Sequence, residues 1–238
     1  MKTKIMMASR KLKIPRKTNF WSTTPTPATH KKEDSIPLLI VLRDYLKIGD
    51  KEREITRLLN TNHVKVDGKI VKDRRFPLGF MDVLSIDTFD HDFIILYDNK
   101  GKLITATNPD ENKGIKLLKV TKKTVIKNGK LQLGFHDGKT IITDKKDIKT
   151  SDVVLMKIPD LEITDVIKME GGNKAFITGG SHVGEIATIK SIEVKKSSGH
   201  NMVNLNDGFS TIKDYIFIIG NPRYTFKIPE KEVIINDE

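Results

Sequence analysis

The sequence contains no cysteine, and this absence excludes several classes of protein. A chain without thiols has no disulfide, no thiolate zinc site, no iron–sulfur cluster and no cysteine nucleophile. The composition fits a reducing compartment. Apolar residues make up only 37% of the 238 residues, but this fraction is sufficient for folded cores in one to three domains.

Long hydrophobic runs are also missing. The longest, residues 36–42, contains a proline and ends at Arg43. It is far shorter than the roughly 20 residues of a membrane-spanning helix. The N-terminus begins as a signal peptide does, but its apolar stretch at 5–8 is about half of the minimum length, and basic residues resume at Arg10. We therefore expect a cytoplasmic protein without a membrane partner.

Acidic residues are absent from the first 32 residues, which carry nine lysines and arginines. This segment therefore holds +9 of the formal net charge of +11. Its prolines and its lack of a helix or strand period predict an irregular, extended arm. A basic extension of this kind is typical of segments that bind nucleic acid, and the alternative is a solubilising tail. Trp21, the single tryptophan, argues against a tail because an indole can stack on a base or fill a cleft.

The arm is followed by two predicted helices. Residues 36–48 have apolar side chains at helical spacing, and Pro37 suits a first-turn position. Residues 51–61 predict a second helix, with Asp50 as its N-cap and Asn62 in the left-handed position after its end.

The rest of the chain predicts strands. Residues 64–71 alternate around Asp67–Gly68, which indicates a tight hairpin, and residues 76–87 add a further strand. Residues 93–165 predict a β meander, and more strands follow from about Gly171.

Motifs for catalysis or metal binding are scarce. The glycine-rich segment 179–184 lacks the Gly-Lys-Ser/Thr ending of a phosphate-binding loop, and Val183 stands where a nucleophile elbow requires glycine. The segment 90–92, Asp-His-Asp, is better explained as a solvated loop than as a cation site. The six histidines are scattered without metal-ligand spacing. We expect no catalytic residue, no metal, no cofactor and no small-molecule substrate.

Three segments carry the motifs of a known family. Residues 14–39 contain Pro-Arg-Lys, Trp, Pro-x-Pro and His in that order, and residues 42–87 contain Phe-Pro-x-Gly-x-Met-Asp-Val. Residues 177–189 are similar to a KOW motif, and 205–220 are similar to the strands that follow it. In this order the segments resemble the archaeal and eukaryotic small-subunit ribosomal protein family S4e, most closely its archaeal members. The resemblance is weakest over 93–165.

The resemblance implies an α+β protein that is a structural, non-catalytic constituent of the small ribosomal subunit in the cytoplasm. Its implied partners are ribosomal RNA and neighbouring ribosomal proteins. The implied parts are a basic N-terminal arm (1–36), a small helix-helix-hairpin RNA-binding module (37–92), a central β domain (93–168), a KOW/SH3-like β-barrel (169–220) and a C-terminal tail (221–238).

Lysine and arginine suit such a role because RNA is recognised largely through its shape and its phosphates. The expected RNA-binding residues are Arg10, Lys11, Lys13, Arg16, Lys17, Trp21, His30, Lys31, Lys32, Arg53, Arg57, Lys69, Lys72, Arg74, Arg75, Lys122, Lys123, Gly180, Ser181 and His182.

Two other functions compete with this reading. An RNA-modifying enzyme, such as a pseudouridine synthase, can carry the same small module, but it would add a large catalytic domain with an Arg-Leu-Asp motif that the sequence lacks. A transcription elongation factor would use the KOW-like barrel to bind polymerase. The order of arm and module disfavours that function.

Overall fold

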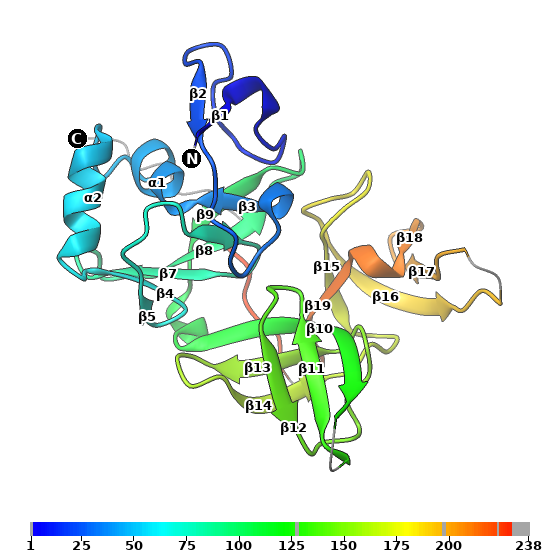
Figure 1. Cartoon of the computed structure of the whole chain (residues 1–238). Coiled ribbons are helices and arrows are strands. Elements are labelled where there is room, and N and C mark those ends of the chain that lie inside the picture. Colours follow the sequence, from blue (N-terminus) through cyan, green and yellow to red (C-terminus); the bar gives the residue numbers. More distant parts are fainter. Residues whose placement is uncertain (1, 127–128, 197–198, 223, 230–238) are drawn as a thin grey trace. The chain divides into compact units, whose positions relative to one another are not determined.

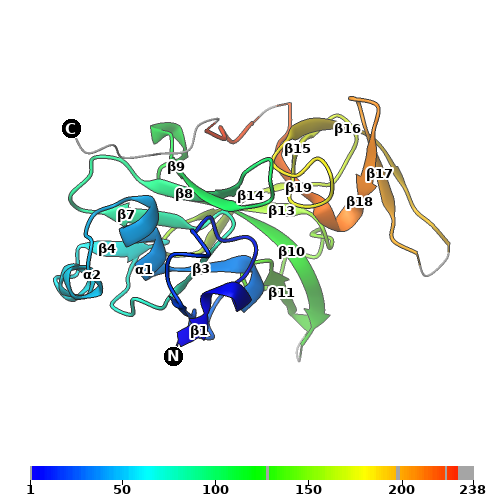
Figure 2. The same ribbon diagram turned by 90° about the horizontal axis from the view of Figure 1, so that it is seen from above.

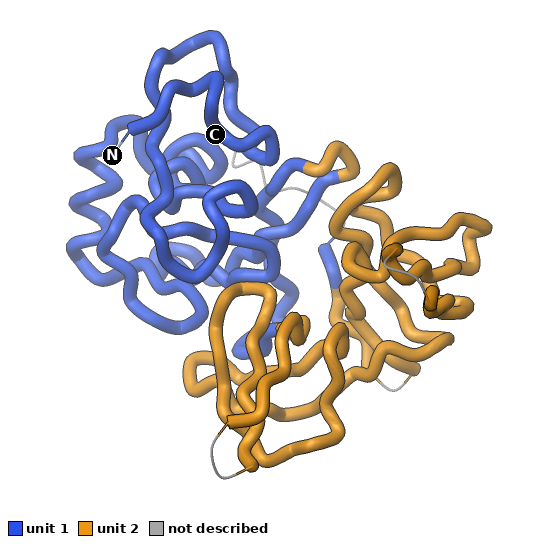
Figure 3. Tube along the Cα trace, turned by 45° about the vertical axis from the view of Figure 1, so that its right-hand side comes forward, with its two compact units in different colours: residues 1–98, 102–116, 228–238 blue, residues 99–101, 117–227 orange. Residues whose placement is uncertain are grey.

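The computed structural model describes residues 2–126, 129–196, 199–222 and 224–229. The described chain is mostly β, with few helices (Figure 1, and from above in Figure 2). It divides into two compact units (Figure 3). The first comprises residues 1–98, 102–116 and 228–238, and the second comprises 99–101 and 117–227. The coarse prediction of strands with a few helices is confirmed.

The arm, in the first unit, is more regular than predicted. Strand β1 (Lys2–Lys4) pairs antiparallel with β2 (Trp21–Thr23), and a single 3-10 turn (Ile5–Met7) follows β1. The arm is ordered because it has its own apolar anchors: Ile5 and Leu12 are buried, and Leu12 forms a parallel bridge with Leu103. Irregular chain was predicted because two three-residue strands leave no readable period.

The first helix is shorter than predicted. Strand β3 (Ser35–Pro37) pairs with β6 (Pro77–Gly79), so Pro37 is extended and stands at the N-cap position instead of in the first turn. Helix α1 (Leu38–Ile40) continues into a π-helical turn (Val41–Tyr45). The residues from 38 to 42 are all buried, as expected of a helix with apolar residues on every side.

Helix α2 (Glu52–Asn60) matches the second predicted helix, but its cap differs. The N-cap residue is Lys51, and the predicted Asp50 cap is wrong. The carboxylate of Glu54 reaches back and accepts hydrogen bonds from the backbone N–H groups of Asp50 (3.0 Å) and Lys51 (3.2 Å). After the helix, Asn62 has the predicted left-handed conformation, with φ of 64°.

A five-stranded sheet completes the first unit, in the order β5-β4-β7-β8-β9. The predicted tight turn is confirmed, since Asp67 and Gly68 have φ of 50° and 75°. Helices α1 and α2 lie beside β4 and β7 in both views (Figures 1 and 2). Strands β7 and β8 pair across position 92, where a domain boundary was expected. The strands are β4 (Val64–Val66), β5 (Lys69–Ile70), β7 (Val83–Ile86), β8 (Phe93–Tyr97) and β9 (Leu103–Thr107).

The second unit is built around two more five-stranded sheets, in the orders β12-β11-β10-β13-β14 and β18-β17-β16-β15-β19. A buried cluster that includes Leu118, Leu133 and Met156 forms the core of the former. Its strands are β10 (Ile115–Val125), β11 (Leu131–Phe135), β12 (Thr140–Thr143), β13 (Val153–Lys157) and β14 (Glu162–Ile167). The other sheet comprises β15 (Lys174–Ile177), β16 (Ile186–Glu193), β17 (Met202–Leu205), β18 (Ser210–Ile212) and β19 (Ile216–Gly220).

Within the described ranges, no helix combines the length and the apolar character that crossing a membrane requires.

Candidate nucleic-acid interface

Helix α2 presents a basic, polar face to solvent. Ile55 and Leu59 are four residues apart and both are buried, so the helix packs on the unit through this stripe. Arg53 and Arg57 have the same spacing on the other side, where both are exposed. The amphipathic pattern of the sequence therefore holds two guanidinium groups on one exposed face.

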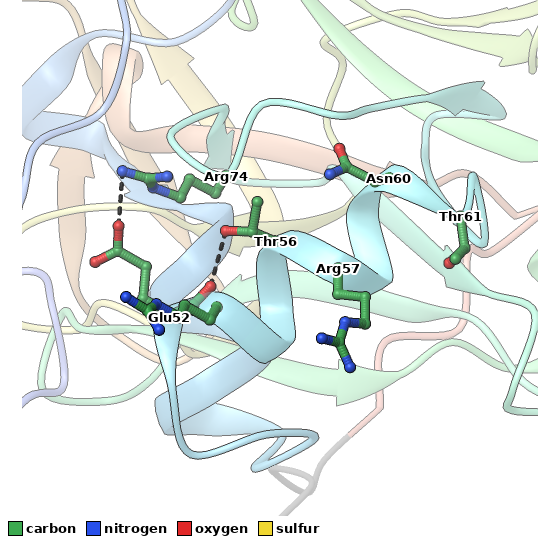
Figure 4. Close-up of a pocket in the computed structure, with 7 residues that line it drawn as sticks. Glu52, Thr56, Arg57, Asn60, Thr61 and Arg74 are labelled. Carbon is green, nitrogen blue, oxygen red and sulfur yellow. Dashed lines mark hydrogen bonds and ion pairs between the residues drawn. The ribbon is translucent and has the colours of Figure 1, made fainter.

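A second element closes this face into a groove. Arg74, from the segment between β5 and β6, places Nη2 2.6 Å from Oε1 of Glu52 at the first turn of α2 (Figure 4). The hydroxyl of Thr56 donates a 2.8 Å hydrogen bond to the carbonyl oxygen of Glu52. The groove has a volume of about 700 Å³ and is lined by Glu52, Arg53, Thr56, Arg57, Asn60, Thr61 and Arg74.

The charge of this α2 groove favours an anion. Glu52 is paired with Arg74, and both side chains are about 40% exposed, so solvent weakens the pair. The side chains of Arg53 and Arg57 make no hydrogen bond or ion pair within the part of the chain that the structure describes. Two planar guanidinium groups are therefore available to phosphates, which they can bind with two hydrogen bonds each. Thr56, Asn60 and Thr61 line the same groove and were not among the expected residues, although their spacing from the arginines was a usable signal.

The predicted basic residues of the arm fall into two groups. Arg10, Lys17, Lys31 and Lys32 are exposed, and their side chains make no hydrogen bond or ion pair with the described residues. Lys13 is exposed, and its backbone N–H donates to the hydroxyl of Tyr45 (2.8 Å).

The other group holds the arm in place. The Lys11 ammonium lies 2.5 Å from Oδ1 of Asp34 and 3.3 Å from the Tyr97 hydroxyl. Burial lowers the pKa of Lys11, but the contacts with Asp34 and Tyr97 outweigh burial and raise it above its usual value. The Arg16 guanidinium donates to the carbonyl oxygens of Ala8 (3.1 Å) and Ser9 (2.7 Å). Both cations therefore have structural partners before any RNA is bound.

His30 is buried and has no surface to offer an RNA, so its expected role as a contact is corrected. Its side chain is 4% exposed, and Nε2 lies 2.8 Å from Oδ2 of Asp82. The imidazole also packs closely on the α-carbon of Gly79, where a β-carbon would overlap it. The histidine therefore joins the arm to the turn between β6 and β7.

Asp82 is the centre of a buried ionic cluster that the sequence reasoning missed. The ammonium of Lys116, fully buried, lies 2.5 Å from Oδ1 of Asp82 and 2.7 Å from Oδ2 of Asp67. Asp82 also accepts the backbone N–H of Gly79 (2.9 Å). Burial raises the pKa of the Asp82 carboxyl, but the charges of His30 and Lys116 outweigh burial and hold its pKa well below the usual range. The Phe-Pro-x-Gly-x-Met-Asp-Val signature thus supplies internal contacts through its glycine and aspartate.

The remaining basic residues of the predicted site are either exposed or bound to structural partners. Lys69 and Lys72, near the hairpin, and Lys122 on β10 are exposed. Arg75 donates from Nε to the hydroxyl of Thr26 (3.1 Å), which fixes the arm. Lys123 donates to the carbonyl oxygens of Lys146 (2.8 Å) and Ile148 (2.7 Å), so its ammonium holds a loop of the second unit.

The predicted glycine-rich loop lies between β15 and β16 of the second unit. Gly180 and Ser181 are exposed. The ring of His182 stacks on Phe209, with 3.8 Å between centroids and 15° between planes, and its Nδ1 lies 3.0 Å from Oε2 of Glu185. The loop therefore contributes His182 to a partly exposed stacked pair of rings, whose other member, Phe209, lies between β17 and β18.

Comparisons with a family model, with known sequences and with solved structures all match the same protein family. The model of ribosomal family S4e matches residues 89–163. The chain is 61% identical to the small ribosomal subunit protein eS4 of Picrophilus torridus, over 96% of this chain and 97% of that protein. Identity to the protein of the same name from Thermoplasma volcanium is 50%, over 98% of each chain. The crystal structure of the 30S ribosomal protein S4e from Thermoplasma acidophilum, 45% identical, matches with a TM-score of 0.73 over 82% of this chain and 100% of that one.

Proposed function

The chain belongs to the S4e family of small-subunit ribosomal proteins, and on this premise we propose that it binds ribosomal RNA through its α2 groove and the exposed cations of its arm. It is a structural constituent of the small ribosomal subunit, works in translation in the cytoplasm, and is not an enzyme. Ribosomal RNA and neighbouring ribosomal proteins are its partners.

The α2 groove supports this proposal most strongly. Arg53 and Arg57 are exposed, unpaired within the described residues, and held four positions apart on a helix that is anchored by its buried side. An enzyme needs groups fixed around a reacting atom, whereas a phosphate backbone needs only reachable positive charge. The groove provides such charge on a rigid element.

Within this role we propose a division of labour along the chain. Residues 1–36 act as a basic arm and 37–92 as a small RNA-binding module. The proposed central β domain, 93–168, rests on β10 to β14, because β8 and β9 extend the sheet of the module. Residues 169–220 act as a KOW/SH3-like barrel, followed by a tail at 221–238. The similarity of 177–189 to a KOW motif supports the barrel, and its loop residues Gly180, Ser181 and His182 are the proposed contacts there.

A salt titration of rRNA binding tests the groove. Arg53→Ala and Arg57→Ala should each weaken binding of the full chain to small-subunit ribosomal RNA. Each should also reduce the slope of log affinity against log salt by about 0.7–0.9, the value for one lost phosphate contact. Lys149→Ala, which removes one exposed charge from the second unit, is the control. If all three variants keep the parental slope and affinity, the α2 groove is not the RNA-binding surface.

A further inference from the structure

The β1–β2 hairpin has a distinct outer face. The register places Lys4 opposite Trp21 and Thr3 opposite Ser22. Because side chains alternate along a strand, Lys4 and Trp21 share one face and Thr3 and Ser22 share the other. Lys4 and Trp21 are exposed, whereas Ser22 is buried, so the face with the tryptophan is the outer one.

Two aromatic rings lie exposed at the start of β2. Phe20 is 62% and Trp21 53% exposed, and their ring centroids are 4.9 Å apart in an edge-to-face arrangement. The ammonium of Lys4 lies 5.6 Å from the centre of the Phe20 ring. Large aromatic side chains next to one another on a surface are typical of binding sites, because burying them is strongly favourable.

These rings border a cleft of about 740 Å³ between the hairpin and the segment that joins α1 to α2. Its walls include Lys2 and Trp21 on the hairpin and Asp44 and Asp50 on the joining segment. Both side-chain oxygens of Asp44 accept hydrogen bonds from Arg43 (2.7 and 2.9 Å). Arg43 and Lys47 also line the cleft, so its positive and negative charges balance, and its carboxylates can accept hydrogen bonds from the amino groups of a base.

We propose that this cleft, the Trp21 cleft, receives one unpaired base of ribosomal RNA, which stacks on Trp21 while its flanking phosphates lie along Lys2 and Lys4. The inference rests on the proposed function and specifies which part of the RNA the Trp21 cleft binds. The absence of any acidic residue from positions 1–32 favours a polyanion over a protein partner. Stacking on an exposed indole is sequence-tolerant, so the cleft selects for an unpaired base more than for a particular one.

Trp21 is the only tryptophan, so its fluorescence reports this cleft alone. The full chain is titrated at low salt with a single-stranded RNA oligonucleotide and, separately, with inorganic polyphosphate of equal charge, and binding is followed in parallel by calorimetry. RNA should quench the fluorescence, whereas polyphosphate should bind without quenching it. Equal quenching by both, or RNA binding without quenching, overturns the proposal. The proposed function is tested separately, by calorimetry of the full chain with small-subunit ribosomal RNA, and it fails if no binding is detected there.

Variants separate stacking from charge. Trp21→Ala should weaken RNA binding roughly 5- to 150-fold, the range for losing one stacked base, and should leave polyphosphate affinity unchanged. Trp21→Phe should recover most of the loss because it keeps a ring. Met7→Ala is the matched control, since Met7 is 74% exposed on the same arm and outside the cleft. If Trp21→Ala binds RNA as Met7→Ala does, or if Trp21 fluorescence responds only to ribosomal proteins, the cleft does not hold a base.

Discussion

Nε2 of His30 lies 2.8 Å from Oδ2 of Asp82, and this contact joins the basic arm to the turn between β6 and β7 in the first unit. Both side chains are almost fully buried. Thr26 also donates two hydrogen bonds from the arm to the segment before β6, from its backbone N–H to the Arg75 carbonyl (2.8 Å) and from its hydroxyl to Asp73 (2.9 Å). The end of the arm is therefore a part of the folded unit, even though its composition is that of a tail.

The close approach of His30 to Gly79 predicts a specific coupling. Gly79→Ala should destabilise the protein because the new methyl group overlaps the imidazole, whereas the backbone angle at this position permits alanine. His30→Ala removes the obstacle, so the double variant should be less destabilised than the sum of the two single ones. Urea unfolding of the four proteins measures the coupling.

Gly134→Ala provides the control for this cycle. Gly134 lies in β11 of the second unit, and a β-carbon there meets only ordinary contacts. The control should change stability little and should not depend on His30. Additive effects of Gly79→Ala and His30→Ala would contradict the packing described for the pair.

Asp82→Asn should lower the free energy of unfolding more than His30→Ala does. Asp82→Asn removes one of the carboxylates that pair with the fully buried ammonium of Lys116. Breaking a buried ion pair from one side costs about 3–5 kcal/mol. The exposed Asp90→Asn serves as a control for loss of one negative charge. A free energy of unfolding for Asp82→Asn equal to that of the control would show that the cluster does not stabilise the fold.

The sequence predicts features that depend on neighbouring residues, but not contacts between residues far apart in the chain. The Asp67–Gly68 turn, the extent of α2 and the conformation of Asn62 follow from neighbouring residues, and they were predicted. Lys116 meets Asp67 and Asp82 across 49 and 34 residues, and no local pattern indicates which charged side chains will be buried together. For the same reason His30 was assigned to the RNA surface: its neighbours are basic, but its partner is Asp82.

The low pKa of Asp82 predicts acid sensitivity. The folded state holds this carboxyl ionised more strongly than the unfolded state does, so the unfolded chain binds more protons between the two pKa values. The stabilisation is therefore complete above the unfolded value of about 4 and declines as the pH falls below it.

Free energies of unfolding measured from pH 7 to pH 3 test this point. Wild type should lose stability more steeply than Asp82→Asn below about pH 4, because the variant lacks this titrating carboxyl. Parallel curves over the whole pH range would mean that the Asp82 carboxyl has the same pKa in the folded and the unfolded state.

The arm's charge can be tested without removing the arm. Deletion of residues 1–32 would also remove Ile5, Leu12 and His30, which are buried, so reduced RNA binding could follow from a damaged fold. A variant in which Arg10, Lys17, Lys31 and Lys32 are all changed to Gln keeps those anchors and removes four exposed charges.

This quadruple variant should unfold at the same urea concentration as wild type, because surface charges of this kind contribute little to stability. Its slope of log affinity against log salt should fall by about 0.7–0.9 for each of these side chains that contacts a phosphate. A second quadruple variant controls for net charge alone. It changes four exposed lysines of the second unit to Gln: Lys100, Lys145, Lys146 and Lys149. Equal slopes for the two variants would show that the arm attracts RNA only through overall charge. A larger drop for the arm variant identifies it as a surface that contacts the phosphates directly.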